Sequence, residues 1–101
     1  MTRHIKVEEF DELVLNSDKP VLIDFYASWC APCKMLAPTI DKISENNPNI
    51  NVYKVNVDEQ GELAQKFGVM SIPTLISFKE GKVYKQALGF IPENKVLELL
   101  K

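Results

Sequence analysis

The sequence predicts one α/β domain in which a central mixed β-sheet has helices on both faces. The chain alternates between strand and helix signals, an alternation that we summarise as βαβαββα without counting every short segment described below. Residues 21–27 are almost continuously apolar, as expected of a strand that is covered on both faces. With 101 residues, 46% of them hydrophobic and 26% charged, the chain has the size and composition of a single domain over residues 1–101.

The N-terminal segments predict a strand, a helix and a second strand. Residues 2–6 suit a short strand. The segment from Glu8 to Leu15 places apolar residues at i, i+3 and i+4, which predicts a helix. Lys19-Pro20 then indicates a turn, which leads into the apolar strand 21–27.

The apolar period changes to that of a helix after this strand. Residues 31–46 carry one helical stripe, formed by Cys33, Leu36, Ile40 and Ile43. Pro38 lies inside the helix and cannot donate a hydrogen bond to the carbonyl of Lys34, so we expect a kink there.

The next segments predict a strand and a short helix. Residues 52–57 are rich in β-branched side chains, which favours a strand. We expect Asp58 to cap a short helix that holds Leu63, Ala64 and Phe67, and Gly68 to end it.

The C-terminal third predicts a hairpin and a last helix. Segments 74–78 and 82–88 flank Glu80-Gly81, which indicates a β-hairpin. Pro92 suits a first helical turn and opens a helix whose inward residues are Val96, Leu97 and Leu100.

Charge and hydropathy disfavour several kinds of partner. Twelve basic and fourteen acidic residues leave a net charge of −2, which argues against a protein that binds nucleic acid. No apolar run approaches the roughly 20 residues that a membrane-spanning helix needs. The N-terminus, MTRHIKVEEF, lacks the apolar stretch of a secretory signal. We therefore expect a cytoplasmic protein, the alternative being a mature chain that has lost a signal. A monomer is the default expectation.

The chain has two cysteines, Cys30 and Cys33, where the apolar strand passes into the helix. Residues three apart in a helical turn have Cβ atoms roughly 5–6 Å apart, so a disulfide can form. Closing so short a loop yields only about 2 kcal/mol, against about 4.7 kcal/mol for a hundred-residue loop. Because the second thiol is always within reach of the first, the spacing favours reversible exchange over structural reinforcement.

The helix start distinguishes the two thiols. Unpaired N–H groups and the helix dipole place positive charge there, so the pKa of Cys30 is expected to fall below the free value of about 8.5. Cys33 lies one turn deeper on the apolar stripe. We therefore expect Cys30 to be the nucleophile and Cys33 the resolving thiol. The alternatives are a buried apolar pair and half of a zinc site shared between chains.

A metal site within one chain is not expected. Tetrahedral zinc needs four ligands, and the only histidine, His4, lies far from the cysteines in sequence. His4 is expected to be solvated and without a role.

Five parts of the chain together form a specific pattern. They are VLIDFYASWCAPCK (residues 21–34), KVNVD (54–58), IPTL (72–75), Glu80-Gly81 and Gly89. In this order and over this length, they resemble the thioredoxin family. The resemblance implies the thioredoxin fold, protein-disulfide reductase activity on client proteins, a redox-active Cys30–Cys33 disulfide and no bound cofactor. It also implies recycling by thioredoxin reductase, which would involve NADPH and FAD only indirectly.

Asp24 interrupts the apolar strand. Burial of a carboxyl group without a partner raises its pKa. The resemblance implies that Asp24 accepts the proton of Cys33; the alternative is an acid that reaches water at a strand irregularity. In the family, the lysine at the position of Lys54 lies near this acid. The resemblance therefore implies that Lys54 tunes the pKa of Asp24, and the alternative is a solvated lysine.

The resemblance also implies a client-binding surface. Only about 5–6% of X–Pro bonds are cis, but the family's bond matching Ile72–Pro73 is cis and faces the cysteines. Pro73 would orient the Ile72 backbone to pair with an extended client segment. The apolar patch around Cys30 would comprise Trp29, Ala31, Pro32, Ile72 and Gly89. The alternatives are a partly buried core position for Trp29 and an ordinary turn at Gly89.

Two residues depart from the usual family pattern. Ala31 stands where glycine is usual, and its methyl group stiffens the loop and enlarges the apolar surface. Tyr26 stands where many members have tryptophan, and its hydroxyl needs a partner. Both changes leave the reacting groups in place.

Two other functions compete with the reductase. An exported oxidase or isomerase tends to have histidine before the second cysteine, whereas this chain has Pro32. A binding subunit with incidental thiols would not need Cys30, Cys33, Asp24 and the Ile72-Pro73 segment together.

Overall fold

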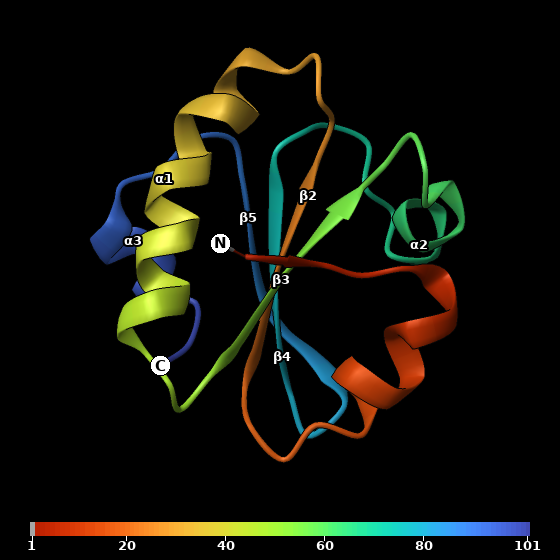
Figure 1. Ribbon diagram of the computed structural model, residues 1–101, viewed down its shortest axis with the longest axis vertical. Helices are drawn as coiled ribbons and strands as arrows, with labels where there is room; N and C mark the ends of the chain where they lie inside the picture. Colours follow the sequence, from red (N-terminus) through yellow and green to blue (C-terminus); the bar gives the residue numbers. More distant parts are fainter. Residues whose placement is uncertain (1) are drawn as a thin grey trace.

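Residues 2–101, which the computed structural model describes, form a five-stranded mixed sheet with helices on both faces (Figure 1). The strands are β1 (Arg3–His4), β2 (Val21–Tyr26), β3 (Asn51–Asn56), β4 (Thr74–Lys79) and β5 (Lys82–Leu88). Their order across the sheet is β1-β3-β2-β4-β5, with β1, β3 and β2 parallel and each later pairing antiparallel. The strands and helices follow one another in the order in which the individual segments are predicted, so the chain has one strand–helix pair more than the order βαβαββα contains. Strand β1 is shorter than the expected strand 2–6.

The central strand, β2, buries both of its faces, which explains its apolar sequence. Val21, Ile23 and Phe25 belong to the core on one face of the sheet. Leu22 belongs to the core on the other face, and Asp24, two residues later, shares that face. A charged side chain in the middle of β2 is therefore placed inside a hydrophobic layer.

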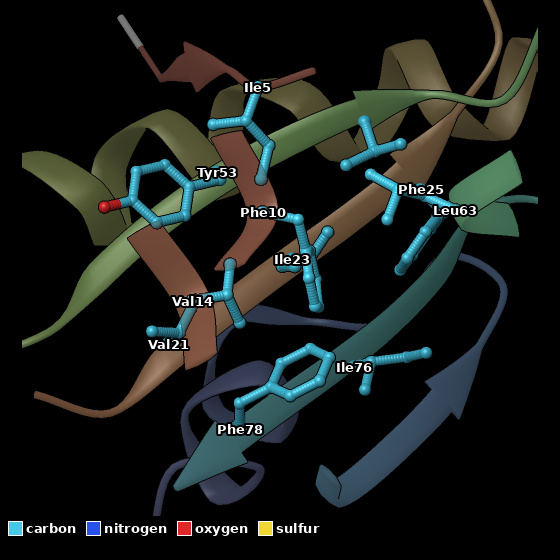
Figure 2. Close-up of a cluster of buried hydrophobic side chains, with 11 residues drawn as sticks. Ile5, Phe10, Val14, Val21, Ile23, Phe25, Tyr53, Leu63, Ile76 and Phe78 are labelled. Carbon is cyan, nitrogen blue, oxygen red and sulfur yellow. The ribbon is translucent and has the colours of Figure 1, made fainter. Parts of the chain in front are cut away.

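The first core lies beneath the N-terminal helical segment and α2 (Gly61–Lys66), which cover one face of the sheet (Figure 1). Apolar side chains from these elements and from the strands converge there (Figure 2). The buried members are Ile5, Phe10, Val14, Val21, Ile23, Phe25, Tyr53, Val55, Leu63, Ile76 and Phe78. The helix predicted from Glu8 to Leu15 is a 3-10 turn, Val7–Glu9, followed by a π-helical turn, Asp11–Leu15.

The second core lies beneath α1 (Ala31–Asn46) and α3 (Glu93–Glu98), on the opposite face (Figure 1). The predicted stripe of α1 is buried at all four positions: Cys33, Leu36, Ile40 and Ile43. The helix continues through Pro38, and the kink there remains a prediction. Pro92 immediately precedes α3 as its N-cap, and Val96 is buried as expected.

The two ends of α2 differ from each other in how well the sequence predicts them. Gly68 ends the helix as expected: with φ of +65° it forms a Schellman motif, in which the Val69 N–H donates to the Ala64 carbonyl at 2.9 Å. The prediction that Asp58 caps this helix is wrong, because the N-cap is Gln60. The Asp58 carboxylate instead accepts a hydrogen bond from the indole N–H of Trp29.

The hairpin between β4 and β5 turns at Glu80 and Gly81, as the sequence predicts. Both residues have positive φ, 54° and 76°, which is the backbone of a type I′ turn. A Cβ atom on Gly81 would lie 2.8 Å from the backbone oxygen of Leu15. The turn therefore packs against the end of the N-terminal helical segment, where only glycine fits.

We expect Gly81→Ala to destabilise the protein more than Gly68→Ala. Both substitutions put alanine at positive φ, which costs about 1–2 kcal/mol. Gly68 has open space around its Cβ position, so it isolates this backbone cost. Urea unfolding of the oxidised proteins measures the difference, and an equal loss of stability in the two variants would contradict the close packing of Gly81 on Leu15.

Candidate active site

Cys30 and Cys33 lie at the start of α1, directly after the loop that leaves β2. Cys30 is the N-cap residue, and the backbone N–H of Cys33 donates a hydrogen bond to its sulfur at 3.2 Å. The two cysteines form a disulfide, with their Cα atoms 5.2 Å apart. Because the N–H groups of a first helical turn lack partners within the helix, they stabilise negative charge on a Cys30 thiolate.

Cys33 faces the interior, as its place on the α1 stripe predicts. It is 3% exposed and packs with Ala27 and Cys30 in a small apolar cluster. Cys30 is also largely covered, at 4% exposure, but the residues on either side of it, Trp29 and Ala31, are exposed. Cys30 is therefore the sulfur that lies next to the surface.

The segment before β4 lies against Cys30. The backbone oxygen of Ile72 is 3.8 Å from the Cys30 sulfur, and the Ile72–Pro73 peptide bond is cis, as the resemblance implies. The N–H of Gly89 donates to the Pro73 carbonyl at 2.8 Å, which brings the loop after β5 to the same place. The structure thus brings together three segments that are far apart in the sequence.

Trp29 is 68% exposed, so the alternative of a core position for it is wrong. Its indole N–H donates to the Asp58 carboxylate at 2.8 Å. Sequence reasoning missed this role of Asp58, because nothing local links a loop residue after β3 to a side chain after β2. The hydrogen bond fixes one edge of the ring beside Cys30.

Asp24 is completely buried, so the alternative of an acid open to water is wrong. No group in residues 2–101 donates a hydrogen bond to either of its carboxyl oxygens. Burial raises the pKa of Asp24 to about 6, an effect that the positive charge of Lys54 opposes and the negative charge of Asp41 reinforces.

Lys54 is the register partner of Asp24 across β2 and β3, and it is half-buried. Its ammonium lies 4.5 Å from the centroid of the Tyr26 ring. We expected the hydroxyl of Tyr26 to need a partner without naming one, and in the structure it lies 2.8 Å from Nδ1 of His4. His4, which we expected to be solvated and without a role, is exposed but holds this tyrosine.

Comparison with known proteins agrees with this geometry. The sequence model of the thioredoxin family matches residues 1–101. The chain is 42% identical to a thioredoxin of Mycoplasmoides gallisepticum over 93 residues, which are 92% of each chain. It is 47% identical to thioredoxin-1 of Saccharomyces cerevisiae over 92 residues, covering 91% of this chain and 88% of the yeast protein. The chain belongs to the thioredoxin family.

Family membership and the Cys30–Cys33 pair establish the chemistry of this thioredoxin. It is a protein-disulfide oxidoreductase that works by dithiol–disulfide exchange. Its mixed sheet with helices on both faces is the thioredoxin fold.

The side chains and helices of residues 2–101 also bear on metal binding and on membranes. No group of three or more histidine, cysteine or acidic side chains in this part of the chain is placed to hold a metal ion. Among its helices, none has the length and apolar character needed to cross a membrane.

We expect Asp24→Asn to stabilise this thioredoxin at high pH but not at low pH. The pKa of Asp24 rises from 3.8 to about 6 on folding, so the native protein loses stability as pH increases through this range. A shift of about two units corresponds to roughly 3 kcal/mol once both states are ionised. Asparagine cannot ionise, so it avoids this loss.

Urea unfolding at about pH 8 and about pH 4 measures the effect, which should be close to its full size at the higher value and small at the lower one. Asp18→Asn, at an exposed position, is the matched control. An equal gain for Asp24→Asn at both pH values would show that ionisation of the buried carboxyl is not the cause.

Proposed function

We propose that this thioredoxin reduces disulfides of client proteins, with Cys30 as the attacking nucleophile and Cys33 as the resolving thiol. The observation that carries the assignment is the hydrogen bond from the Cys33 N–H to the sulfur of Cys30 at the N-cap of α1. It favours the thiolate on Cys30, while the apolar surroundings of Cys33 favour its neutral thiol.

The reaction proceeds in two exchanges. The Cys30 thiolate attacks one sulfur of the client disulfide, which forms a mixed disulfide and releases the other client sulfur as a thiolate. Cys33 then loses its proton and attacks the Cys30 sulfur. The second client thiolate leaves, and the Cys30–Cys33 disulfide remains. The dithiol has then lost two electrons, and the client disulfide has gained them.

We propose Asp24 as the acceptor of the Cys33 proton, directly or through a water. A buried thiol has no access to bulk solvent and needs a base nearby. The carboxyl of Asp24 has no hydrogen-bond donor in residues 2–101, and its pKa of about 6 lets it take up and return a proton near neutral pH. Lys54 tunes this group, because its positive charge lowers the pKa of Asp24.

The client-binding surface, in this proposal, surrounds Cys30. Its residues come from the loop before α1, the start of α1, the cis-proline segment and the loop after β5. They are Trp29, Ala31, Pro32, Ile72, Pro73 and Gly89. The position of the Ile72 backbone oxygen, 3.8 Å from the Cys30 sulfur, supports pairing of this backbone with an extended client segment during attack.

The dithiol has to be restored after each cycle. A thioredoxin reductase would supply the two electrons from NADPH through FAD, so this chain itself would bind no cofactor. A reductant has to work where thiols are kept reduced, which favours the cytoplasm. We propose that the protein acts there as a monomer.

Single-cysteine variants test the roles of the two thiols. We expect Cys33→Ser to accumulate a mixed disulfide with insulin, because Cys30 can still attack but nothing resolves the product. Cys30→Ser should form little mixed disulfide with insulin. Both variants should reduce insulin at least about a hundredfold more slowly than the wild type. Non-reducing gel electrophoresis and NADPH-coupled insulin reduction are the measurements.

Alkylation of the reduced wild-type protein provides an independent control. Iodoacetamide near neutral pH should label Cys30 at least about tenfold faster than Cys33, since only the thiolate reacts. Equal trapping by the two variants, or equally slow labelling of both sulfurs, would contradict the assignment.

Asp24→Asn should slow the resolving step without slowing the first attack. Stopped-flow measurement of mixed-disulfide formation and release separates the two rates. Resolving rates that match the wild type from about pH 6 to about pH 9 would remove Asp24 from the mechanism.

A further inference from the structure

Three side chains, those of His4, Lys54 and Asp24, lie side by side on neighbouring strands, from the edge strand β1 to the central strand β2. His4 on β1 is paired in register with Lys54 on β3, and Lys54 is paired in register with Asp24 on β2. Residues paired in this way in neighbouring strands share a face of the sheet. Tyr26, two residues after Asp24 on β2, shares the same face.

Lys54 does not bind the carboxyl group next to it. Neighbouring strands lie about 4.7–4.9 Å apart, and the four-carbon stem of lysine is long enough to bring its ammonium to a register partner. Yet no group in residues 2–101, Lys54 included, hydrogen-bonds to the Asp24 carboxyl. The ammonium lies over the face of the Tyr26 ring instead, 4.5 Å from its centroid.

The Tyr26 ring is itself held in place from β1. Its hydroxyl and Nδ1 of His4 are 2.8 Å apart. The two rings also meet edge to face, with centroids 5.5 Å apart and planes at 78°. The ring face that receives Lys54 is therefore fixed by a residue on the edge strand of the sheet.

We propose that Tyr26, held by His4, is a positioning residue that keeps the Lys54 ammonium over its ring and away from the Asp24 carboxyl. The inference rests on the proposed function, since it concerns the group proposed as the proton acceptor. An ion pair with Lys54 would hold Asp24 ionised and make it a poor base for Cys33. With the ammonium on the ring, Asp24 feels the charge only from a distance.

The other groups around Asp24 are a second acid, the disulfide and an apolar side chain, and the positive charge of Lys54 also lowers the pKa of that second acid, Asp41. Helix α1 contributes Asp41, whose carboxylate accepts hydrogen bonds from the backbone and side chain of Thr2 and raises the pKa of Asp24. It also contributes Cys33, which is in the disulfide in this structure. Strand β4 places the apolar Leu75 opposite Asp24. Lys54 is thus the cation whose position governs the pKa of Asp24.

Removing the ring should release the ammonium. In Tyr26→Leu, we expect Lys54 to move toward Asp24 and the pKa of Asp24 to fall by at least about one unit, as an opposite charge at close range produces. Tyr26→Phe keeps the ring but loses the bond to His4, so a smaller fall is expected. Tyr26→Trp keeps an aromatic face and should restore a value near that of the wild type.

The test is an NMR titration of the Asp24 carboxyl carbon in the full-length oxidised protein, carried out for each variant with and without Lys54→Gln. Lys54→Gln alone should raise the pKa of Asp24, and in that background Tyr26→Leu should no longer lower it. An unchanged pKa in Tyr26→Leu, or an equal fall without Lys54, would overturn the proposal. If Tyr26→Leu does not fold, Tyr26→Phe with the same pairing decides the question.

The titration separates this inference from the proposed function. A pKa that moves as expected while Asp24→Asn resolves mixed disulfides at the wild-type rate would leave the positioning role intact and reject Asp24 as the base. A slow Asp24→Asn variant with a pKa of Asp24 insensitive to Tyr26 would do the reverse.

Discussion

The hydrogen bond from the Cys33 N–H to the Cys30 sulfur exists because α1 begins one residue after Cys30. The start of α1 depends in turn on β2, which is anchored on both faces and delivers the chain to this point. Placing a sulfur at an N-cap gives it the N–H groups that a helix leaves unpaired. The same helix then carries the second sulfur inward, so a single junction makes two identical residues chemically different.

Burial of Asp24 is the second constraint, and it opposes folding. The sheet places a carboxyl inside an apolar layer, where its ionised form is poorly solvated. This cost keeps the pKa of the group near neutrality, within the range in which a proton acceptor is useful. The neighbouring cation is held on an aromatic ring instead of neutralising the acid. Stability and the proton transfer that we propose therefore make opposite demands on this position.

Local sequence patterns predicted most of the secondary structure for physical reasons that operate within a few residues. The stripe on α1, the Gly68 helix end and the Glu80-Gly81 turn each depend on nearby backbone geometry, and each is confirmed. The Asp58 cap was wrong because a carboxylate that suits an N-cap also suits an indole N–H. That donor comes from a loop 29 residues earlier in the chain, and no local rule weighs it.

The sequence by itself determined which residues we propose to carry the chemistry: two thiols three apart at a helix start and one acid in an apolar strand. Tertiary structure alone decided which distant groups surround them. Three contacts join separate strands and loops in this way. The carbonyl of Ile72 lies beside Cys30, Asp58 accepts a hydrogen bond from Trp29, and the ammonium of Lys54 lies over the ring of Tyr26. Spacing along the chain fixes neighbours within a helix or strand, whereas contacts between strands depend on register and sheet order, which only the folded chain sets.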